Sequence, residues 1–245
     1  MSSNFFCFNM EIPNLSSIKE SYSNLKEEEA IPIELKDYLV SLEARTNMIN
    51  WLTFLCNTLN FKDQTLFRTV SIFDQYFSQI SLKEMEEMTQ EKLNLITIAS
   101  LSLATKLEEN NCNYISFLNE KVLNTPNQKK FTNKDLTSME LTILKTLKYK
   151  TIYSTPLDFI DIYLNIFEKN NSIMIPEILS NIKTLTMNIM KNNINNENYL
   201  INTASHFSYL CFIQALNQVS IMNSLCYKQL QKTIFTFNYQ LGNMF

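Results

Sequence analysis

Apolar residues recur at helical spacing along most of the chain. From about residue 34 onward, leucine, isoleucine and phenylalanine stand three, four or seven residues apart, and no alternation with a period of two persists anywhere. The first spacing places apolar side chains on one face of a helix, whereas a half-buried strand needs the second. The sequence therefore predicts an all-α protein. In the first half we expect helices over about 35–59, 63–77, 90–109, 114–123 and 132–147, the second of them capped by Asp63.

The second half of the chain repeats this plan. Helical patterns follow at about 156–167, 176–190, 199–216 and 223–238, and Pro156 suits the start of a helix. The small pair Ala204-Ser205 stands 105 residues after Ala99-Ser100, which suggests a weak internal duplication. We therefore expect three parts: an irregular N-terminal segment over 1–34, a helical domain over 35–150 and a second helical domain over 151–245.

Glycine is nearly absent, because Gly242 is the only one among 245 residues. Phosphate-binding loops and dinucleotide-binding folds need glycine where the backbone turns sharply or approaches a ligand closely. His206 is likewise the only histidine, and its apolar surroundings in the sequence predict a packed helix residue. The five cysteines are scattered, with no C-x-x-C pair that would indicate a zinc site. We therefore expect no catalytic residues, no cofactor and no metal.

Charge and hydropathy limit the possible partners and the location. The net charge of −3 provides no basic field for nucleic acid, and no stretch of 18 uncharged apolar residues could span a membrane. The first residues lack the basic and apolar regions of a secretory signal, and the odd number of scattered cysteines fits a reducing compartment. We expect an intracellular protein of the nucleus, the cytoplasm or both, with neither nucleic acid nor membrane as partner.

Several spaced motifs, in the right order, resemble the cyclin family. The cyclin-box pattern is found at Arg45, Met48, Trp51-Leu52, Phe61, Leu66, Thr69 and Phe73-Asp74, and continues through TKLEEN at 105–110, MELTILKTL at 139–147 and TPLDFIDIYL at 155–164. The resemblance is to cyclins of the cell-cycle type and covers about residues 35–168 well. It implies tandem five-helix cyclin folds, a cyclin box followed by a more diverged fold. Because the C-terminal part is short, we expect the fifth helix of the second fold to be missing or only partly formed.

The resemblance assigns a kinase-binding surface and implies a non-catalytic function. A cyclin binds a cyclin-dependent Ser/Thr protein kinase and activates it by holding the kinase's mobile helix in the active position. The residues that match the family's kinase contact are Lys106, Glu140, Leu103, Leu107, Leu144 and Tyr149. Charged groups would fix the register of the contact, and apolar neighbours would supply its area. Arg45 and Asp74 match an internal ion pair that ties the first helix of the box to the second.

A second surface implied by the resemblance is a groove that docks short Arg-x-Leu peptides of kinase substrates and inhibitors. Its residues match Ala44, Asn47, Met48, Trp51, Leu93 and Asn94. Relatives usually carry larger apolar side chains at the positions of Ala44 and Asn47. Phe54 stands where relatives often have an acid that pairs with the arginine of the peptide. These departures weigh against docking of the usual peptide.

Two other classes of function stay open. A non-kinase adaptor, similar to general transcription factors that use two cyclin-like repeats to hold DNA and polymerase, would need a basic stripe facing the DNA. The net charge of −3 and the presence of only two arginines argue against such a stripe. An enzyme in its own right is least favoured, because glycine loops and clusters of metal ligands are missing from the sequence.

Overall fold

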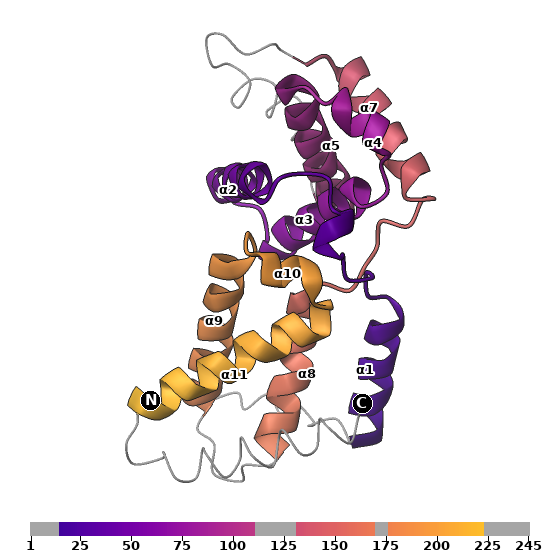
Figure 1. Cartoon of the computed structure of the whole chain (residues 1–245). Helices are drawn as coiled ribbons and strands as arrows, with labels where there is room; N and C mark the ends of the chain where they lie inside the picture. Colours follow the sequence, from indigo (N-terminus) through magenta and orange to yellow (C-terminus); the bar gives the residue numbers. More distant parts are fainter. Residues whose placement is uncertain (1–14, 111–130, 170–175, 223–245) are drawn as a thin grey trace.

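The computed structural model of the chain describes residues 15–110, 131–169 and 176–222, and every regular element within these ranges is a helix (Figure 1). The elements are α1 (Leu15–Glu27), the short 3-10 helix η1 (Leu35–Asp37), α2 (Leu42–Thr58), α3 (Asp63–Phe77), α4 (Leu82–Glu86), α5 (Gln90–Glu108), α7 (Asn133–Thr146), α8 (Pro156–Lys169), α9 (Pro176–Asn193), α10 (Glu197–Ile201) and α11 (Ala204–Met222). The predicted all-α class is confirmed. The helices predicted at 114–123 and 223–238 lie outside the described residues, as does the expected truncation of the last helix.

Local capping explains where several helices begin. The Thr132 hydroxyl accepts a hydrogen bond from the Asp135 N–H at the start of α7, and the Asp135 carboxylate accepts one from the Thr132 N–H in return. Helix α3 differs from the prediction, because Asp63 is its first residue and not its cap. The Asp63 carboxylate instead accepts a hydrogen bond from Lys191 Nζ, 2.7 Å away in α9.

The helix predicted over 35–59 is divided in the structure. Residues 35–37 form the separate turn η1, and α2 begins only after Ser41, whose hydroxyl accepts a hydrogen bond from the Ala44 N–H. The apolar spacing runs through both parts because Tyr38 and Val40, in the extended link, are buried in the same core as α2. The apolar pattern is continuous in the sequence, although the helix is interrupted between η1 and α2.

The first bundle is built around α3 and α5. These two helices pack side by side, α7 lies against α5, and α2 crosses both of them (Figure 1). Every residue of α3 from Thr65 to Phe77 is buried, so this helix is enclosed on all sides. A helix enclosed in this way fixes the position of its neighbour α5, and α7 is positioned in turn by its packing against α5.

The second bundle consists of α8, α9 and α11, and α1 packs along α8 (Figure 1). The expectation of an irregular segment over 1–34 is therefore wrong for residues 15–27. Helix α1 buries a narrow stripe that includes Ile18 and Tyr22, and the Tyr22 ring lies 5.8 Å from that of Phe159. The polar residues around this stripe obscure it in the sequence, because α1 is stabilised by contacts with a helix far away along the chain.

The helix predicted over 199–216 is also divided, into α10 and α11, at Asn202 and Thr203. As a consequence, His206 lies in the first turn of α11 and is exposed, so the expectation of a packed residue was wrong. Ala204 and Ser205 begin α11, whereas Ala99 and Ser100 lie in the middle of α5. The two small pairs therefore do not occupy equivalent places in the two bundles.

The two bundles meet along a continuous apolar layer. Leu52, Phe67 and Leu101 come from the first bundle and share one buried cluster with Ile160, Met190 and Phe207 of the second. Side chains that are fully removed from water on both sides of a boundary resist separation of the two parts. The helical halves thus form one packed body.

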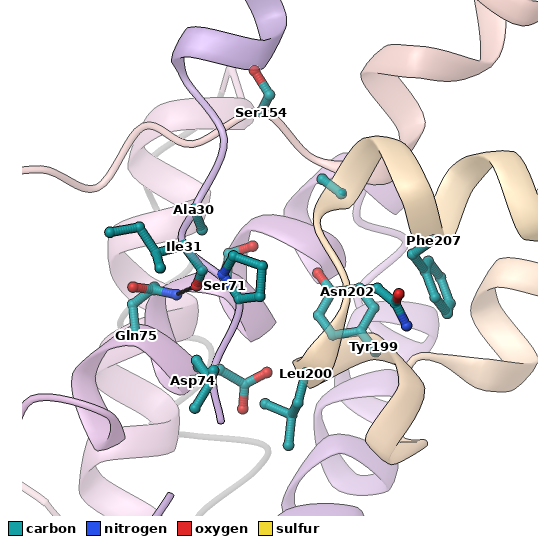
Figure 2. Close-up of a pocket in the computed structure, with 13 residues that line it drawn as sticks. Ala30, Ile31, Ser71, Asp74, Gln75, Ser154, Tyr199, Leu200, Asn202 and Phe207 are labelled. Atoms are coloured by element: carbon teal, nitrogen blue, oxygen red, sulfur yellow. Dashed lines mark hydrogen bonds between the residues drawn. The ribbon is translucent and has the colours of Figure 1, made fainter. Parts of the chain in front are cut away.

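A strap, residues 28–34, crosses the junction between the bundles (Figure 2). The Gln75 side-chain amide of α3 donates a hydrogen bond to the Ile31 carbonyl, at 3.1 Å. Two residues later, the Ile33 N–H donates one to the Leu200 carbonyl of α10, at 2.9 Å. The strap therefore links the first bundle to the second through its own backbone.

Candidate partner-binding surface on helices α5 and α7

Lys106 and Glu140 meet directly between the last turn of α5 and the middle of α7. The Lys106 Nζ lies 2.6 and 2.7 Å from the two carboxylate oxygens of Glu140. The Glu140 side chain is 8% exposed and that of Lys106 is 41% exposed. An ammonium group has three donors, and Glu140 takes two of them. The pair can therefore offer one strong donor to a partner while it holds α5 and α7 together.

The apolar residues predicted around this pair divide into two groups. Leu103 is buried and Leu144 is half-buried, and both pack against the core of the first bundle. Leu107 is 44% exposed and Tyr149 is 64% exposed. Only the second group lies open to a partner without a change in the core.

Two further exposed apolar residues near this surface were not predicted. Leu141 is 45% exposed on α7, next to Glu140, and Ile152 is 58% exposed in the link to α8. Leu141 could have been found, since the inward positions Leu136 and Ile143 leave it on another face of the helix. Ile152 stands outside any helix, so no periodic pattern marks it.

Tyr149 is held in place by an unusual helix end. Its N–H donates a hydrogen bond to the Leu144 carbonyl at 2.7 Å, which closes the last turn of α7. Both Lys148, with φ of 50°, and Tyr149, with φ of 62°, adopt left-handed backbone. Glycine normally occupies such positions, and side chains with a Cβ are uncommon there. The structure thus keeps an exposed aromatic ring at a fixed point beside α7, at a conformational cost.

Arg45 and Asp74 form an ion pair inside the molecule. Arg45 Nε lies 2.9 Å from Asp74 Oδ1, and its terminal nitrogen lies 2.8 Å from Oδ2, so the contact is bidentate. The Tyr38 hydroxyl also donates to Oδ1, at 2.7 Å. Burial raises the pKa of Tyr38 well above its usual value, and the Asp74 carboxylate acts in the same direction. Burial alone would lower the pKa of Arg45, but the Asp74 charge raises it above its ordinary value.

The same arginine also reaches the second bundle, which the sequence did not indicate. Its guanidinium donates to the carbonyls of Asn195, at 2.9 Å, and Ile194, at 3.2 Å, in the turn between α9 and α10. It lies 5.8 Å from the centre of the Tyr199 ring. The pair that was expected to join two helices of the first bundle therefore connects both bundles.

The residues expected to form a peptide groove lie where α2 passes α5. Met48 and Leu93 are buried in the core of the first bundle, and Ala44 and Trp51 are half-buried against it. Asn47 is exposed, and Asn94 is half-buried and accepts a hydrogen bond from the Gln90 side chain at 2.9 Å. Phe54, one turn beyond Trp51, is 63% exposed. The set shares one face, but its largest apolar members already pack into the core, and peptide docking stays a prediction.

Two hollows in the described part of the chain lie under the strap and at the start of α11. The cavity under the strap has a volume of about 40 Å³ and lies between Asp74, Tyr199 and Leu200 (Figure 2). Sites for small molecules usually measure hundreds of Å³. A second hollow of about 350 Å³ lies at the start of α11, where the Ser205 hydroxyl accepts from Lys26 and thereby joins α11 to α1.

The described residues contain no group of three or more potential metal ligands. Nor does any helix in the described ranges have the length and hydropathy needed to cross a membrane.

Comparisons with known proteins identify the family. The family model "Cyclin, N-terminal domain" matches residues 18–152, from α1 to the link before α8. Cyclin-SDS of Arabidopsis thaliana is 28% identical over 144 residues, which cover 58% of this chain and 22% of that protein. The G2/mitotic-specific cyclin-B2 of Anguilla japonica is 26% identical over 156 residues, covering 61% of this chain and 37% of the relative. The chain thus matches only about a fifth to two fifths of these relatives' length.

The fold is also found in a solved cyclin structure. A viral cyclin from herpesvirus saimiri superposes with a TM-score of 0.65 at 17% identity, covering 93% of this chain and 97% of that one. The likeness extends through both bundles, whereas the family model ends before the second. The matched model spans more than half of the residues. The chain belongs to the cyclin family.

Proposed function

We propose that this chain is a non-catalytic regulatory subunit that binds and activates a cyclin-dependent Ser/Thr protein kinase. The observation that carries the proposal is the partly exposed Lys106–Glu140 pair with Leu107, Leu141 and Tyr149 exposed on the same two helices and the turn after them. Exposed apolar and aromatic side chains are typical of the centre of a protein interface, and a charge-assisted contact beside them can fix its geometry. We call these five residues the α5–α7 surface.

Activation would work by selection of one kinase conformation. In a free kinase of this class, the mobile helix carrying the glutamate that pairs with the ATP-positioning lysine is rotated away. A surface that binds only the inward arrangement shifts the population toward it. Because α5 packs against the enclosed helix α3 and α7 packs against α5, the α5–α7 surface would be rigid enough to act as such a template. The kinase supplies all of the phosphoryl-transfer chemistry.

A binding experiment with a matched pair of variants tests the proposal. Leu141→Glu introduces a charge next to Glu140 on the α5–α7 surface, and Leu210→Glu introduces the same charge on α11. The two leucines are 45% and 46% exposed, so the substitutions should disturb folding equally. Each tagged full-length protein is incubated with native cell extract, and recovered histone-phosphorylating activity is measured. We expect wild type and Leu210→Glu to recover a kinase and Leu141→Glu to lose at least about tenfold.

Other outcomes would change the conclusion in distinct ways. Equal recovery by all three proteins would retain a kinase partner but place its contact elsewhere. Recovery by none of them would favour an adaptor built on the cyclin fold.

A regulatory subunit of a kinase acts wherever its kinase is found, and we propose that this protein acts in the nucleus, the cytoplasm or both.

A further inference from the structure

The end of α7 carries lysines without compensating carboxylates. Lys145, Lys148 and Lys150 stand within six residues and are all exposed. In the described ranges, no ion pair involves any of the three. We call residues 145–150 the lysine turn. Lys145 in the last turn of the helix complements the helix dipole, but Lys148 and Lys150 lie beyond the helix and have no such partner.

The acidic groups near the C-terminal ends of α5 and α7 are already engaged. Glu140 is paired with Lys106, and the Glu108 carboxylate lies 2.8 Å from Arg68 Nε. Glu109 accepts a hydrogen bond from the Lys62 N–H at 2.8 Å. The positive charge of the lysine turn is therefore not offset by these neighbours.

The lysine turn is well ordered by its own backbone. Lys148 N–H donates to the Lys145 carbonyl at 3.1 Å, and Lys150 N–H donates to the Leu147 carbonyl at 2.9 Å. The Lys150 ammonium lies 5.3 Å from the centre of the Tyr153 ring, which holds this charge by a cation–π contact. The backbone of the turn and the Lys150 side chain are thus held in place beside Tyr149, and preorganisation of this kind favours association.

We infer that the lysine turn docks an acidic segment of the kinase, with two or more Asp or Glu side chains, next to the contact at Lys106 and Glu140. The inference rests on the proposed function and specifies the chemistry of the partner. Two observations carry it: the uncompensated charge, and the continuity of the lysine turn with the α5–α7 surface through Tyr149, which belongs to both. Complementary charge at the rim of an interface chiefly raises the association rate and makes it depend on salt.

The test measures association kinetics between the full chain and the kinase that it recovers, purified to homogeneity. The test variant is Lys145→Gln/Lys148→Gln/Lys150→Gln. The control, Lys19→Gln/Lys36→Gln/Lys183→Gln, removes the same net charge from α1, η1 and α9. Rates are recorded at about 50 and 300 mM NaCl, a range over which screening of exposed charges changes strongly. Thermal unfolding verifies that both variants are folded.

We expect the test variant to associate about tenfold more slowly at low salt and to show a flatter salt dependence, while the control stays within about twofold of wild type. Replacement of the same three lysines by arginine should restore the rate. A test variant that matches wild type at both salt concentrations would overturn the inference. If Leu141→Glu still abolishes binding in that case, the proposed function stands; if wild type binds no kinase, both fail.

Discussion

Asp74→Asn should strongly destabilise the protein, because it removes the carboxylate that forms a bidentate ion pair with a fully buried arginine. Arg45 is 0% exposed and gives two of its hydrogen bonds to Asp74. Breaking a buried pair by neutralising one partner typically costs about 3–5 kcal/mol, since the other charge stays buried without compensation. Domains of this kind are stable by only about 5–15 kcal/mol in total. The substitution should therefore remove a large part of the free energy of unfolding.

A double variant distinguishes a simple pair from the wider network. Arg45→Met/Asp74→Leu removes both charges, and a simple pair would then recover most of the lost stability. Here the carbonyls of Ile194 and Asn195 and the hydroxyl of Tyr38 would also lose their partners. Each unsatisfied group costs about 1–3 kcal/mol when buried. We expect the double variant to stay at least about 2 kcal/mol less stable than wild type.

Urea unfolding at pH 7, followed by circular dichroism, measures both effects. The control is Asp161→Asn, which breaks an exposed pair with Lys183 and should change stability by less than about 1 kcal/mol. Hydrogen exchange provides a local measurement, because the Ile33 N–H is bonded to Leu200 across the junction and should lose protection in Asp74→Asn. If Asp74→Asn unfolds within 1 kcal/mol of wild type, on the order of the control, the network does not stabilise the junction as described.

Two further predictions concern stability alone. Lys148→Gly should stabilise the protein by about 1 kcal/mol, because the backbone φ angle of Lys148 is 50° and glycine adopts this angle without strain. Lys145→Gly, inside α7, should destabilise the protein by about the same amount. Equal unfolding midpoints for the two variants would contradict the strain at Lys148. Raising the pH should also destabilise the fold. Burial raises the pKa of Cys56 from 9.0 to about 12 and that of Tyr38 well above 10.0. As the pH rises, the unfolded chain loses these protons before the folded chain does. The contribution of the two groups to the free energy of unfolding is therefore fully present below pH 9. Above its unfolded pKa, each group lowers the free energy of unfolding by up to about 1.4 kcal/mol per pH unit. A urea midpoint that is unchanged between pH 8 and pH 10.5 would rule this out.

Much of the fold could be predicted because its central helices are apolar on many sides. Helices α3, α5, α7 and α8 were predicted within about two residues, since their buried faces repeat strongly at helical spacing. Helix α1 was missed because Ile18 and Tyr22 are separated by polar residues and are buried by helices far away along the chain, chiefly α8. The division at Asn202 was missed for the opposite reason, because apolar residues continue on both sides of it.

The candidate site was predicted in part. The resemblance to cyclins pointed to Lys106 and Glu140, and the structure brings their side chains into contact. It could not say which leucines are exposed, since exposure depends on how α7 packs against α5. Leu144 is half-buried, while Leu141, three residues earlier, is open to solvent. The additional bonds of Arg45 to the turn after α9 likewise depend on how two distant segments meet.

Activation of a kinase by the α5–α7 surface can be measured as the phosphorylation rate of a purified cyclin-dependent kinase with and without this protein. The kinase is held at fixed concentration, and wild type, Leu141→Glu and Leu210→Glu are each titrated against it. We predict that wild type and Leu210→Glu raise the rate to the same maximum, and that Leu141→Glu requires at least about tenfold more protein. A kinase that binds wild type without any increase in rate, or Leu141→Glu titrating like wild type, would contradict the account.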